Sequence, residues 1–118
     1  MKILLVKLSS LGDVVHTLPV VQDITAALPN ARIDWVVEKS FAPLLQPLLL
    51  PGGGLRRVIT CELRHWRKAP LSALLRGQWG SFKSELQLDA YDAVIDLQGL
   101  SKSAFVARLA RLARGGKR

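Results

Sequence analysis

Ile3-Leu4-Leu5-Val6, continued by Lys7-Leu8-Ser9-Ser10-Leu11-Gly12-Asp13, is the stretch that decides the fold. A continuous apolar run of this length is typical of a strand that is covered on both faces, as in a parallel sheet. The small and polar residues that follow predict a loop leading into a helix over 14–28. Because proline suits the first turn of a helix, we expect the main helix to begin at Pro19, with a short turn before it.

The rest of the chain repeats this alternation of strand and helix. Strands are predicted over 33–37, 57–60 and 92–96, and helices over 38–50, 67–88 and 101–114. The last helix is expected to place Phe105, Leu109 and Leu112 inward and Arg108, Arg111 and Arg114 outward. The alternation predicts an α/β fold, a Rossmann-like parallel sheet of four strands with flanking helices. Because a further strand would be expected after residue 114, one sheet edge is predicted to be unclosed, which indicates a truncated domain.

The composition bounds the class of protein. With 118 residues, 49% of them hydrophobic, the chain fits one compact domain or part of one and is not a disordered protein. The net charge of +8 favours anionic partners such as nucleic acid, acidic lipid or sugar phosphates. The single cysteine, Cys61, excludes an internal disulfide and is predicted to be an inert, partly buried thiol. No apolar run is long enough for a signal peptide or a membrane span, so a cytoplasmic protein is expected.

Two loops follow predicted strands, at the sheet edge where ligands bind in open α/β folds. They are residues 7–13 and 96–102. The first loop has one glycine, too few for a dinucleotide fingerprint, and it lacks the Gly-Lys-Ser/Thr of a P-loop. It offers instead the carboxylate of Asp13, near a helix N-terminus, which can accept a proton from a bound hydroxyl. Ser10 and Asp13 also fit a capping box, in which their side chains satisfy free backbone N–H groups, so both interpretations stay open.

Four segments, in order along the chain, resemble the ADP-heptose:lipopolysaccharide heptosyltransferases, above all those that add the first heptose of the inner core. They are 3–19 (ILLVKLSSLGDVVHTLP), 34–38 (DWVVE), 64–68 (RHWRK) and 91–104 (YDAVIDLQGLSKSA). The resemblance spans nearly the whole chain and implies a GT-B fold, in which two Rossmann-like halves face a cleft. Since the family's members are much longer, residues 1–118 are expected to be part of the N-terminal, acceptor-binding half, without the C-terminal donor-binding half.

The resemblance also implies a reaction. Heptose would pass from ADP-heptose to a Kdo hydroxyl of Kdo-lipid A with inversion, and Asp13 would be the general base. A basic cluster would meet the anionic groups of the acceptor, which suit guanidinium groups. Its members are Arg64, Arg67 and Lys68, and the further acceptor-site candidates in the two loops are Lys7, Ser10, Gln98 and Lys102. ADP-heptose is a substrate, so neither a cofactor nor a metal is implied, and this chain alone is expected to be inactive.

Simpler or different interpretations stand beside these. The basic cluster and the three outward arginines also fit an ordinary solvated surface, and the arginines alternatively fit contact with the anionic inner face of the inner membrane. His16 is expected to be packed or solvated, and the tryptophans to be core anchors, with Trp66 the best candidate for a sugar platform. A basic nucleic-acid- or nucleotide-binding module without transferase activity is the alternative function. It is disfavoured because no nucleic-acid motif is present and aromatic residues make up only 6%, so no nucleic acid is expected as a partner.

Overall fold

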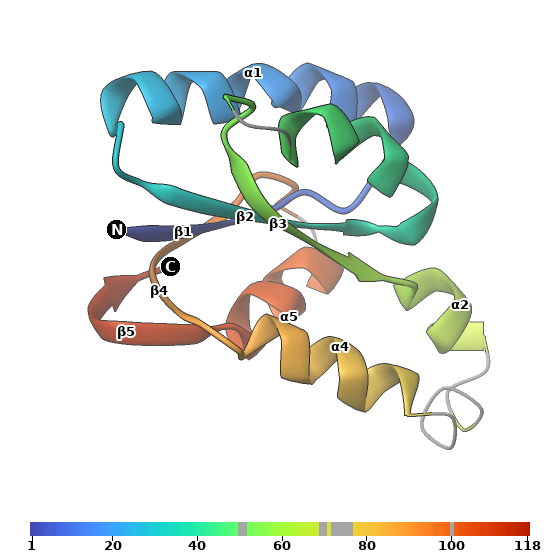
Figure 1. Cartoon of the computed structure of the whole chain (residues 1–118). Coiled ribbons are helices and arrows are strands. Elements are labelled where there is room, and N and C mark those ends of the chain that lie inside the picture. The colour runs from blue at the N-terminus through green and yellow to red at the C-terminus, as the bar shows by residue number, and fades with distance from the viewer. Residues whose placement is uncertain (50–51, 69–70, 72–76, 100) are drawn as a thin grey trace.

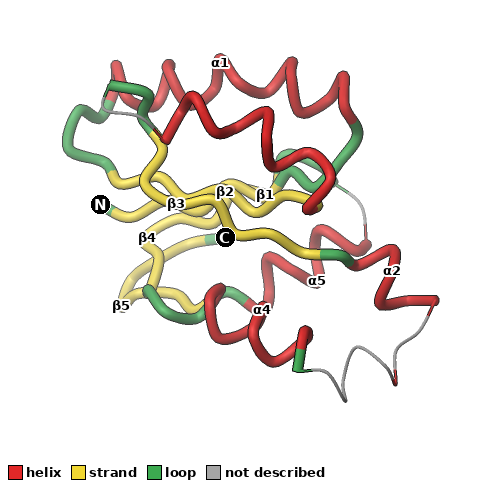
Figure 2. Tube along the Cα trace, turned by 45° about the vertical axis from the view of Figure 1, so that its right-hand side comes forward, coloured by secondary structure: helices red, strands yellow, loops and turns green. Residues whose placement is uncertain are grey.

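The computed structural model describes residues 1–49, 52–68, 71, 77–99 and 101–118. For a few of these only the backbone is described, namely Arg64, His65, Arg67, Ser101 and Lys102. A parallel sheet forms the middle layer, with helices on both of its faces (Figures 1 and 2). The fold class predicted from the sequence is confirmed.

Five parallel strands make up the sheet. They are β1 (Lys2–Val6), β2 (Arg32–Glu38), β3 (Leu55–Cys61), β4 (Ala90–Asp96) and β5 (Arg111–Lys117). Their order across the sheet is β3-β2-β1-β4-β5, the order of a Rossmann-type sheet. The chain therefore reverses its direction of travel across the sheet between β1 and β4, where such folds bind ligands.

The helices divide between the two faces. They are α1 (Leu11–Ala27), the 3-10 helix η1 (Lys39–Leu49), α2 (Leu63–Lys68), α4 (Gln78–Leu86) and α5 (Ser101–Leu109). Figure 1 shows α1 and η1 above the sheet and α2, α4 and α5 below it, and Figure 2 shows the same division from another side. Among the described residues, no helix combines the length and the apolarity that crossing a bilayer would require.

Burial on both faces explains why β1 is apolar without interruption. Ile3 and Leu5 belong to the core beneath α1 and η1, together with Trp35 of β2. Leu4 and Val6 point to the opposite core, which α2, α4 and α5 complete. A strand with both faces covered has no place for the polar alternation of a half-exposed strand. The four predicted strands are confirmed, and Cys61, at the end of β3, is fully buried, where a partly buried thiol was expected.

Helix α1 begins earlier than predicted. It starts at Leu11 and runs without a break through Pro19, whereas the sequence predicted a main helix starting at that proline. Proline removes the hydrogen bond to the carbonyl four residues before it, here that of Val15. Because Pro19 and Val15 both lie on the exposed side of α1, water can satisfy that carbonyl. The buried residues on this helix are Val14, Thr17 and Val21.

The C-terminal region differs most from the prediction. The predicted helix 101–114 ends at Leu109, and Arg111–Lys117 forms a fifth strand on the free edge of β4, so the prediction of a four-stranded sheet was wrong. Phe105 was expected to point inward but is 49% exposed. Leu109 and Leu112, also expected inward, are partly buried and pack against the core, and the buried residues of this segment are Ser103, Val106, Ala107 and Ala110. The free edge of β4 offers backbone hydrogen bonds to residues 111–117, and these outweigh the weak helical pattern of residues 111–114.

The helices predicted over 67–88 are also displaced. The first, α2, already begins at Leu63, so the whole basic segment 64–68 lies on a helix, whereas the prediction placed only residues 67 and 68 on one. The second, α4, begins after Gly77, whose φ of +71° suits glycine, and it continues through Gly80. Residues 69–70 and 72–76, which the prediction also covered, lie outside the described residues.

Candidate functional site

The two loops that the sequence singled out meet at the carboxyl edge of the sheet. One follows β1 and the other follows β4, and these strands are neighbours. The N–H of Leu97 donates to the carbonyl of Val6 at 3.0 Å, which continues the pairing of the strands into the loops. The Lys7 ammonium reaches the carbonyl of Leu97 at 3.4 Å. The two loops are therefore in direct contact, whereas a ligand site shared between them stays a prediction.

The side chain of Gln98 joins the two loops. Its Oε1 accepts hydrogen bonds from the backbone N–H groups of Leu8, at 2.8 Å, and Ser9, at 3.1 Å. Its Nε2 donates to the hydroxyl of Ser9 at 3.4 Å. The side chain that was expected to line the acceptor site thus also fixes the backbone of the neighbouring loop.

The loop after β4 is shaped by Asp96, the last residue of that strand. One oxygen of its carboxylate accepts the N–H groups of Gln98 and Gly99, both at 3.0 Å. The other oxygen accepts the hydroxyl of Ser103, in α5, at 3.0 Å. These contacts turn the chain from β4 toward α5 and hold the backbone of Gln98 beside the first loop.

Strand β2 holds the other side of the first loop. The indole N–H of Trp35 donates to the carbonyl of Lys7 at 3.0 Å, and the N–H of Glu38 donates to the carbonyl of Leu8 at 3.0 Å. Both Trp35 and Leu8 are fully buried. Trp35 is a core anchor, as predicted, and its indole N–H has a specific partner. The loop is thus tied to β2 through its carbonyls and to Gln98 through its N–H groups.

Asp13 lies in the first turn of α1, and its residue is exposed. Ser10 is the N-cap of this helix by its backbone, because its carbonyl accepts the N–H of Val14 at 2.8 Å. Its side chain makes no capping bond, so the capping-box interpretation is not supported. The Ser10 hydroxyl instead lies 3.5 Å from the carboxylate of Asp13, a long contact. Asp13 therefore lies at an exposed position on the edge of this loop.

The other predicted acceptor-site residues are only partly brought together. Lys7 is half-buried between the loops, and Ser10 is exposed beside Asp13. Segment 64–68 lies on α2, beyond the carboxyl end of β3, the outermost strand on that side of the sheet. Lys68 is exposed there. The side chains of Arg64, Arg67 and Lys102 lie outside the described residues, and within the described part of the chain no three acidic, histidine or cysteine side chains form a metal-binding group.

Trp66 is not positioned as a sugar platform in this chain. It is 8% exposed, and its indole N–H donates to Oε1 of Gln78 at 3.1 Å. Its ring makes a T-shaped contact with that of Trp79, at a centroid separation of 5.9 Å, and a tilted contact with that of Phe82, at 5.6 Å. Trp66 is therefore a core anchor between α2 and α4, where the aromatic pairs contribute beyond their burial.

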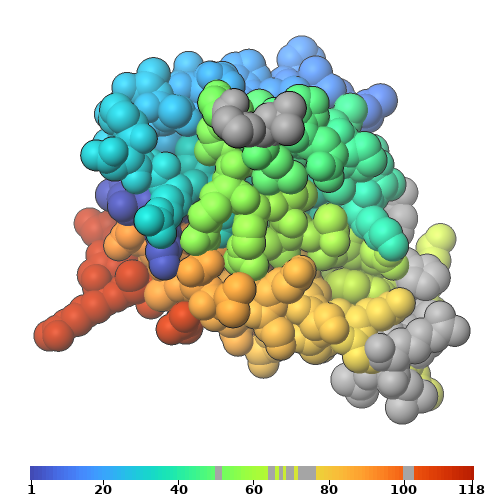
Figure 3. All heavy atoms as spheres, viewed as in Figure 1, coloured from blue at the N-terminus to red at the C-terminus, as the bar shows by residue number. Residues whose placement is uncertain are grey.

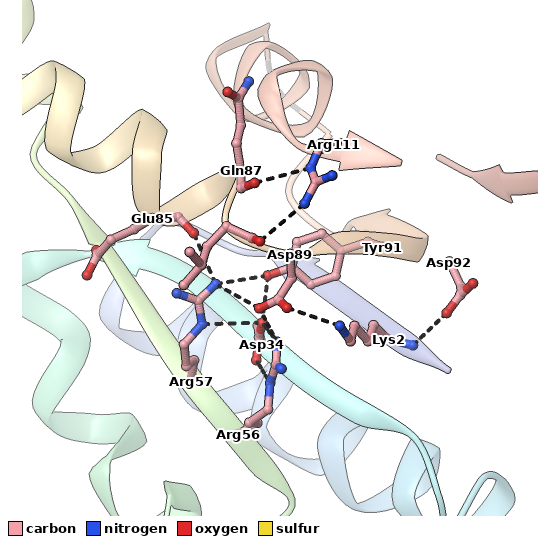
Figure 4. Close-up of polar contacts among 11 residues, drawn as sticks. Lys2, Asp34, Arg56, Arg57, Glu85, Gln87, Asp89, Tyr91, Asp92 and Arg111 are labelled. Atoms are coloured by element: carbon pink, nitrogen blue, oxygen red, sulfur yellow. Dashed lines mark hydrogen bonds and ion pairs between the residues drawn. The ribbon is translucent and has the colours of Figure 1, made fainter. Parts of the chain in front are cut away.

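A charged cluster, which the sequence analysis missed, occupies the opposite end of the strands (Figure 4). The buried carboxylate of Asp34 accepts both guanidinium bonds of Arg56 and the hydroxyl of Tyr91, the latter at 2.6 Å. Asp89 accepts the ammonium of Lys2 at 3.0 Å and Arg56 at 2.7 Å. Arg57 adds ion pairs at 3.6 Å to both carboxylates. The signal in the sequence was an aspartate inside the apolar run 33–37, since a buried carboxylate requires partners.

The pKa values of this cluster follow from its contacts. Hydrogen bonding to Asp34 raises the pKa of Arg56 above its ordinary range, against the effect of burial. Burial, followed by the bond to Asp34, raises the pKa of the Tyr91 phenol. The hydrogen bond from Lys2, followed by that from Arg56, lowers the pKa of Asp89, although burial opposes the shift. Each shift favours the protonation state in which the group makes these contacts: charged for Arg56 and Asp89, neutral for Tyr91. The cluster connects four strands and lies at the opposite end of the sheet from the two loops.

Comparison with known proteins shows relatives over nearly the whole chain. Lipopolysaccharide heptosyltransferase 1 of Escherichia coli K12 is 46% identical over 119 residues, and the protein of the same name from Pseudomonas aeruginosa PAO1 is 48% identical over 108 residues. These alignments cover 99% and 92% of this chain but 35% and 29% of the relatives. The chain thus spans about a third of the length of the curated relatives that it matches. No family model matches the chain.

Solved structures of heptosyltransferases also match this chain. The E. coli heptosyltransferase WaaC with ADP superposes with a TM-score of 0.84 at 46% identity, over 94% of this chain and 34% of that one. The same enzyme with ADP-2-deoxy-2-fluoro heptose gives 0.82 at 44% identity, over 99% and 35%. A glycosyl transferase family 9 protein of Veillonella parvula, at 19% identity and a TM-score of 0.72 over 92% and 29%, shares the fold.

Proposed function

We propose, from the premise that this chain belongs to the lipopolysaccharide heptosyltransferase family, that it supplies the acceptor-binding half of an inner-core heptosyltransferase. The relatives carry that name, and the chain matches about a third of their length. The donor, ADP-heptose, would be held mainly by the remaining two thirds, across a cleft from the loops after β1 and β4. The family assignment gives no support to the alternative of a nucleic-acid-binding module.

The reaction that we propose uses Asp13 as the general base. The carboxylate takes the proton of a Kdo hydroxyl while the hydroxyl oxygen forms a bond to the anomeric carbon of heptose. The bond from that carbon to ADP breaks, ADP leaves with the electron pair, and the configuration inverts. The observation that carries the proposal is the placement of Asp13, exposed at the start of α1 beside a loop that is held on both sides. A fixed loop can hold a base in the orientation that proton transfer requires.

The acceptor contacts are proposed on charge. Kdo and the lipid A phosphates are anionic, and the basic cluster lies at the same sheet edge as Asp13. Its members are Arg64, Arg67 and Lys68, with Lys7, Ser10, Gln98 and Lys102 nearer the base. Because both lone pairs of the Gln98 Oε1 already accept N–H groups, the amide nitrogen is the part of the side chain left for a ligand, as a donor.

A peripheral contact with the inner face of the inner membrane would bring the enzyme to its lipid-anchored acceptor. Figure 3 shows side chains of the C-terminal segment, in red, projecting from the rest of the surface. Arg108, in α5, and Arg114, in β5, are exposed. Arg111 is also exposed, but its guanidinium donates to the carbonyls of Gln87 and Leu88, both at 3.2 Å. Because the guanidinium of Arg111 is already hydrogen-bonded within the chain, Arg108 and Arg114 are the residues that we propose for contact with anionic lipid.

A hybrid enzyme tests the proposed base. In it, these 118 residues replace the matching third of the E. coli relative, and ADP release is measured with Kdo-lipid A and ADP-heptose. Asp13→Asn should lower kcat by about 10²- to 10⁴-fold, the usual contribution of a general base, with little change in KM. Asp23→Asn, at an exposed position of the same helix, is the matched control and should keep the parental rate. Undiminished turnover by Asp13→Asn would exclude the assignment.

Two further measurements test the proposal that this chain binds the acceptor and the rest of the enzyme binds the donor. The 118-residue chain alone should release no ADP in response to acceptor, because half of a two-sided site cannot position both substrates. In the hybrid enzyme, Arg67→Ala combined with Lys68→Ala should weaken the binding of Kdo-lipid A while leaving the KM for ADP-heptose unchanged. An equal effect on both substrates would contradict a role confined to the acceptor.

A further inference from the structure

We infer that Gln98 is a positioning residue: its side-chain amide fixes the loop after β1 and thereby holds Asp13 in its reactive orientation. The inference rests on the proposed function, because it concerns the same base. It goes beyond that function in giving Gln98 a role through the protein backbone, in addition to any contact with the acceptor. The structure supplies each link between the amide and the carboxylate.

The first link is the pair of N–H groups that Gln98 binds. Leu8 is fully buried, so its N–H has little access to water if Oε1 of Gln98 is removed. A buried N–H without a partner is costly, and a loop can avoid that cost by moving its backbone toward solvent. Loss of the amide is therefore expected to displace the Leu8–Ser9 backbone.

The second link runs from this backbone to Asp13. Ser10 follows directly, and its carbonyl accepts the first helical hydrogen bond of α1, from the N–H of Val14. Asp13 lies in the turn that this bond closes, and its carboxylate faces the Ser10 hydroxyl. A displacement at Ser9 and Ser10 thus carries over to the start of the helix and to the base.

The displacement caused by losing the amide should stay local. The carbonyls of Lys7 and Leu8 are held by Trp35 and Glu38 from β2, and these bonds do not involve Gln98. The core residues of β1 remain packed on both faces. Removing the amide should therefore release one side of the loop without unfolding the sheet.

Gln98 is itself held in place. Its N–H and that of Gly99 donate to the Asp96 carboxylate, which also binds Ser103 in α5. The backbone under the amide is thus fixed by a strand end and a helix. Gly99, with φ of +71°, supplies the conformation that this tight turn needs. The backbone of Gln98 is thus held by β4 and α5, and its side chain holds the loop that leads to Asp13.

The test compares three variants in the hybrid enzyme. Gln98→Leu keeps the approximate size and removes both acceptor and donor, Gln98→Asn keeps the amide on a shorter side chain, and Gln98→Glu keeps an acceptor for the two N–H groups. We expect kcat to fall about 10- to 100-fold for the leucine variant, the size of effect that a displacement of about 1 Å produces. The asparagine variant should fall similarly, and the glutamate variant should recover most of the rate. The leucine variant also loses the proposed contact of the amide nitrogen with the acceptor, and the resulting rise in the acceptor KM should stay below about threefold, a factor worth under 1 kcal/mol in binding.

Hydrogen exchange supplies a readout that does not depend on turnover. The amides of Leu8 and Ser9 should exchange faster in the leucine and asparagine variants and should stay protected in the glutamate variant, while those of β1 are unchanged. If the leucine variant fails to fold, the asparagine variant carries the comparison. Unchanged kcat with unchanged protection would overturn the inference, and so would a raised acceptor KM at constant kcat, which would make Gln98 only an acceptor ligand. If Asp13→Asn remains active, the proposed base fails, whereas the exchange result still decides whether Gln98 fixes the loop.

Discussion

The carboxylate of Asp34, fully buried in β2, accepts two hydrogen bonds from the guanidinium of Arg56 in β3, at 3.0 and 2.6 Å. A register irregularity between the strands makes this contact. Ile33 is paired with Leu55 but Asp34 with Arg57, so that Arg56 is an extra residue in β3. Both arginines can consequently reach the same carboxylate. The bulge thus allows the charged carboxylate of Asp34 to be buried inside a parallel sheet.

Removing the acid should destabilise the fold strongly. In Asp34→Ala, Arg56 loses its main partner, and the Tyr91 hydroxyl loses its acceptor. Breaking a buried pair by removing one partner costs about 3–5 kcal/mol. Because Arg56 keeps its ion pair with Asp89 at 2.7 Å, we expect a loss near the lower end of that range. Urea unfolding followed by circular dichroism measures the loss. Asp23→Ala, at an exposed position of α1, is the control and should stay within about 0.5 kcal/mol of the parent. Equal midpoints for the two variants would show that the network contributes nothing.

The single tyrosine makes the same network visible by absorbance. Tyr91 is the only tyrosine in the chain, and burial together with its bond to Asp34 raises the pKa of its phenol. A raised pKa stabilises the native state at neutral pH, and that stability is lost as the pH rises above the unfolded value of about 10. Tyrosinate absorbance should therefore appear well above pH 10, together with unfolding. Tyr91→Phe should abolish the signal. Half-ionisation near pH 10 in a folded chain would contradict the buried bond.

The acid side of the stability profile should depend on Lys2. The bond from Lys2 is the largest cause of the lowered pKa of Asp89, whose ordinary value is 3.8. A lowered native pKa stabilises the fold above the unfolded value, and this contribution is lost as the pH falls through the native value. Stability should accordingly decline below about pH 4. Lys2→Met should weaken that decline, measured as the urea midpoint against pH. A steeper decline in the variant would contradict the assignment.

The sequence predicted those features that depend on neighbours along the chain. The uninterrupted apolar residues of β1 indicate burial on both faces, and the polar residues after β1 and β4 indicate a shared edge, because parallel strands end together. The first prediction is confirmed by the two core clusters, which bury β1 on both of its faces, and the second by the strand order and the contacts of Gln98. The role of Asp13 as base stays a prediction, since its accessible position allows that role but does not test it.

Features that depend on partners distant in sequence were not predictable in this way. The partners of Asp34 come from two other strands, and the bulge that brings Arg56 to it leaves no local signature. The first four residues of β5, 111–114, were predicted as the end of a helix because this sequence has few β-formers, and pairing with the free edge of β4 determines the observed strand. Helix α1 passes through Pro19 because the carbonyl left without a partner faces water, which depends on packing and not on sequence spacing.

Two glycine substitutions should have opposite effects on stability. A Cβ on Gly116, in β5, would lie 2.6 Å from the carbonyl oxygen of Tyr91 and 3.0 Å from that of Ala113, and both are backbone atoms that cannot turn aside. Gly116→Ala should therefore force β5 away from β4 and cost about 1–3 kcal/mol, as overpacking does. Gly80, within α4, has nothing within 4 Å of such a Cβ, so Gly80→Ala should stabilise the fold by about 0.5–1 kcal/mol. Urea midpoints order the variants, and faster exchange of the β5 amides in Gly116→Ala alone would locate the damage. A Gly116→Ala chain as stable as the parent would show that β5 does not pack against β4 in solution.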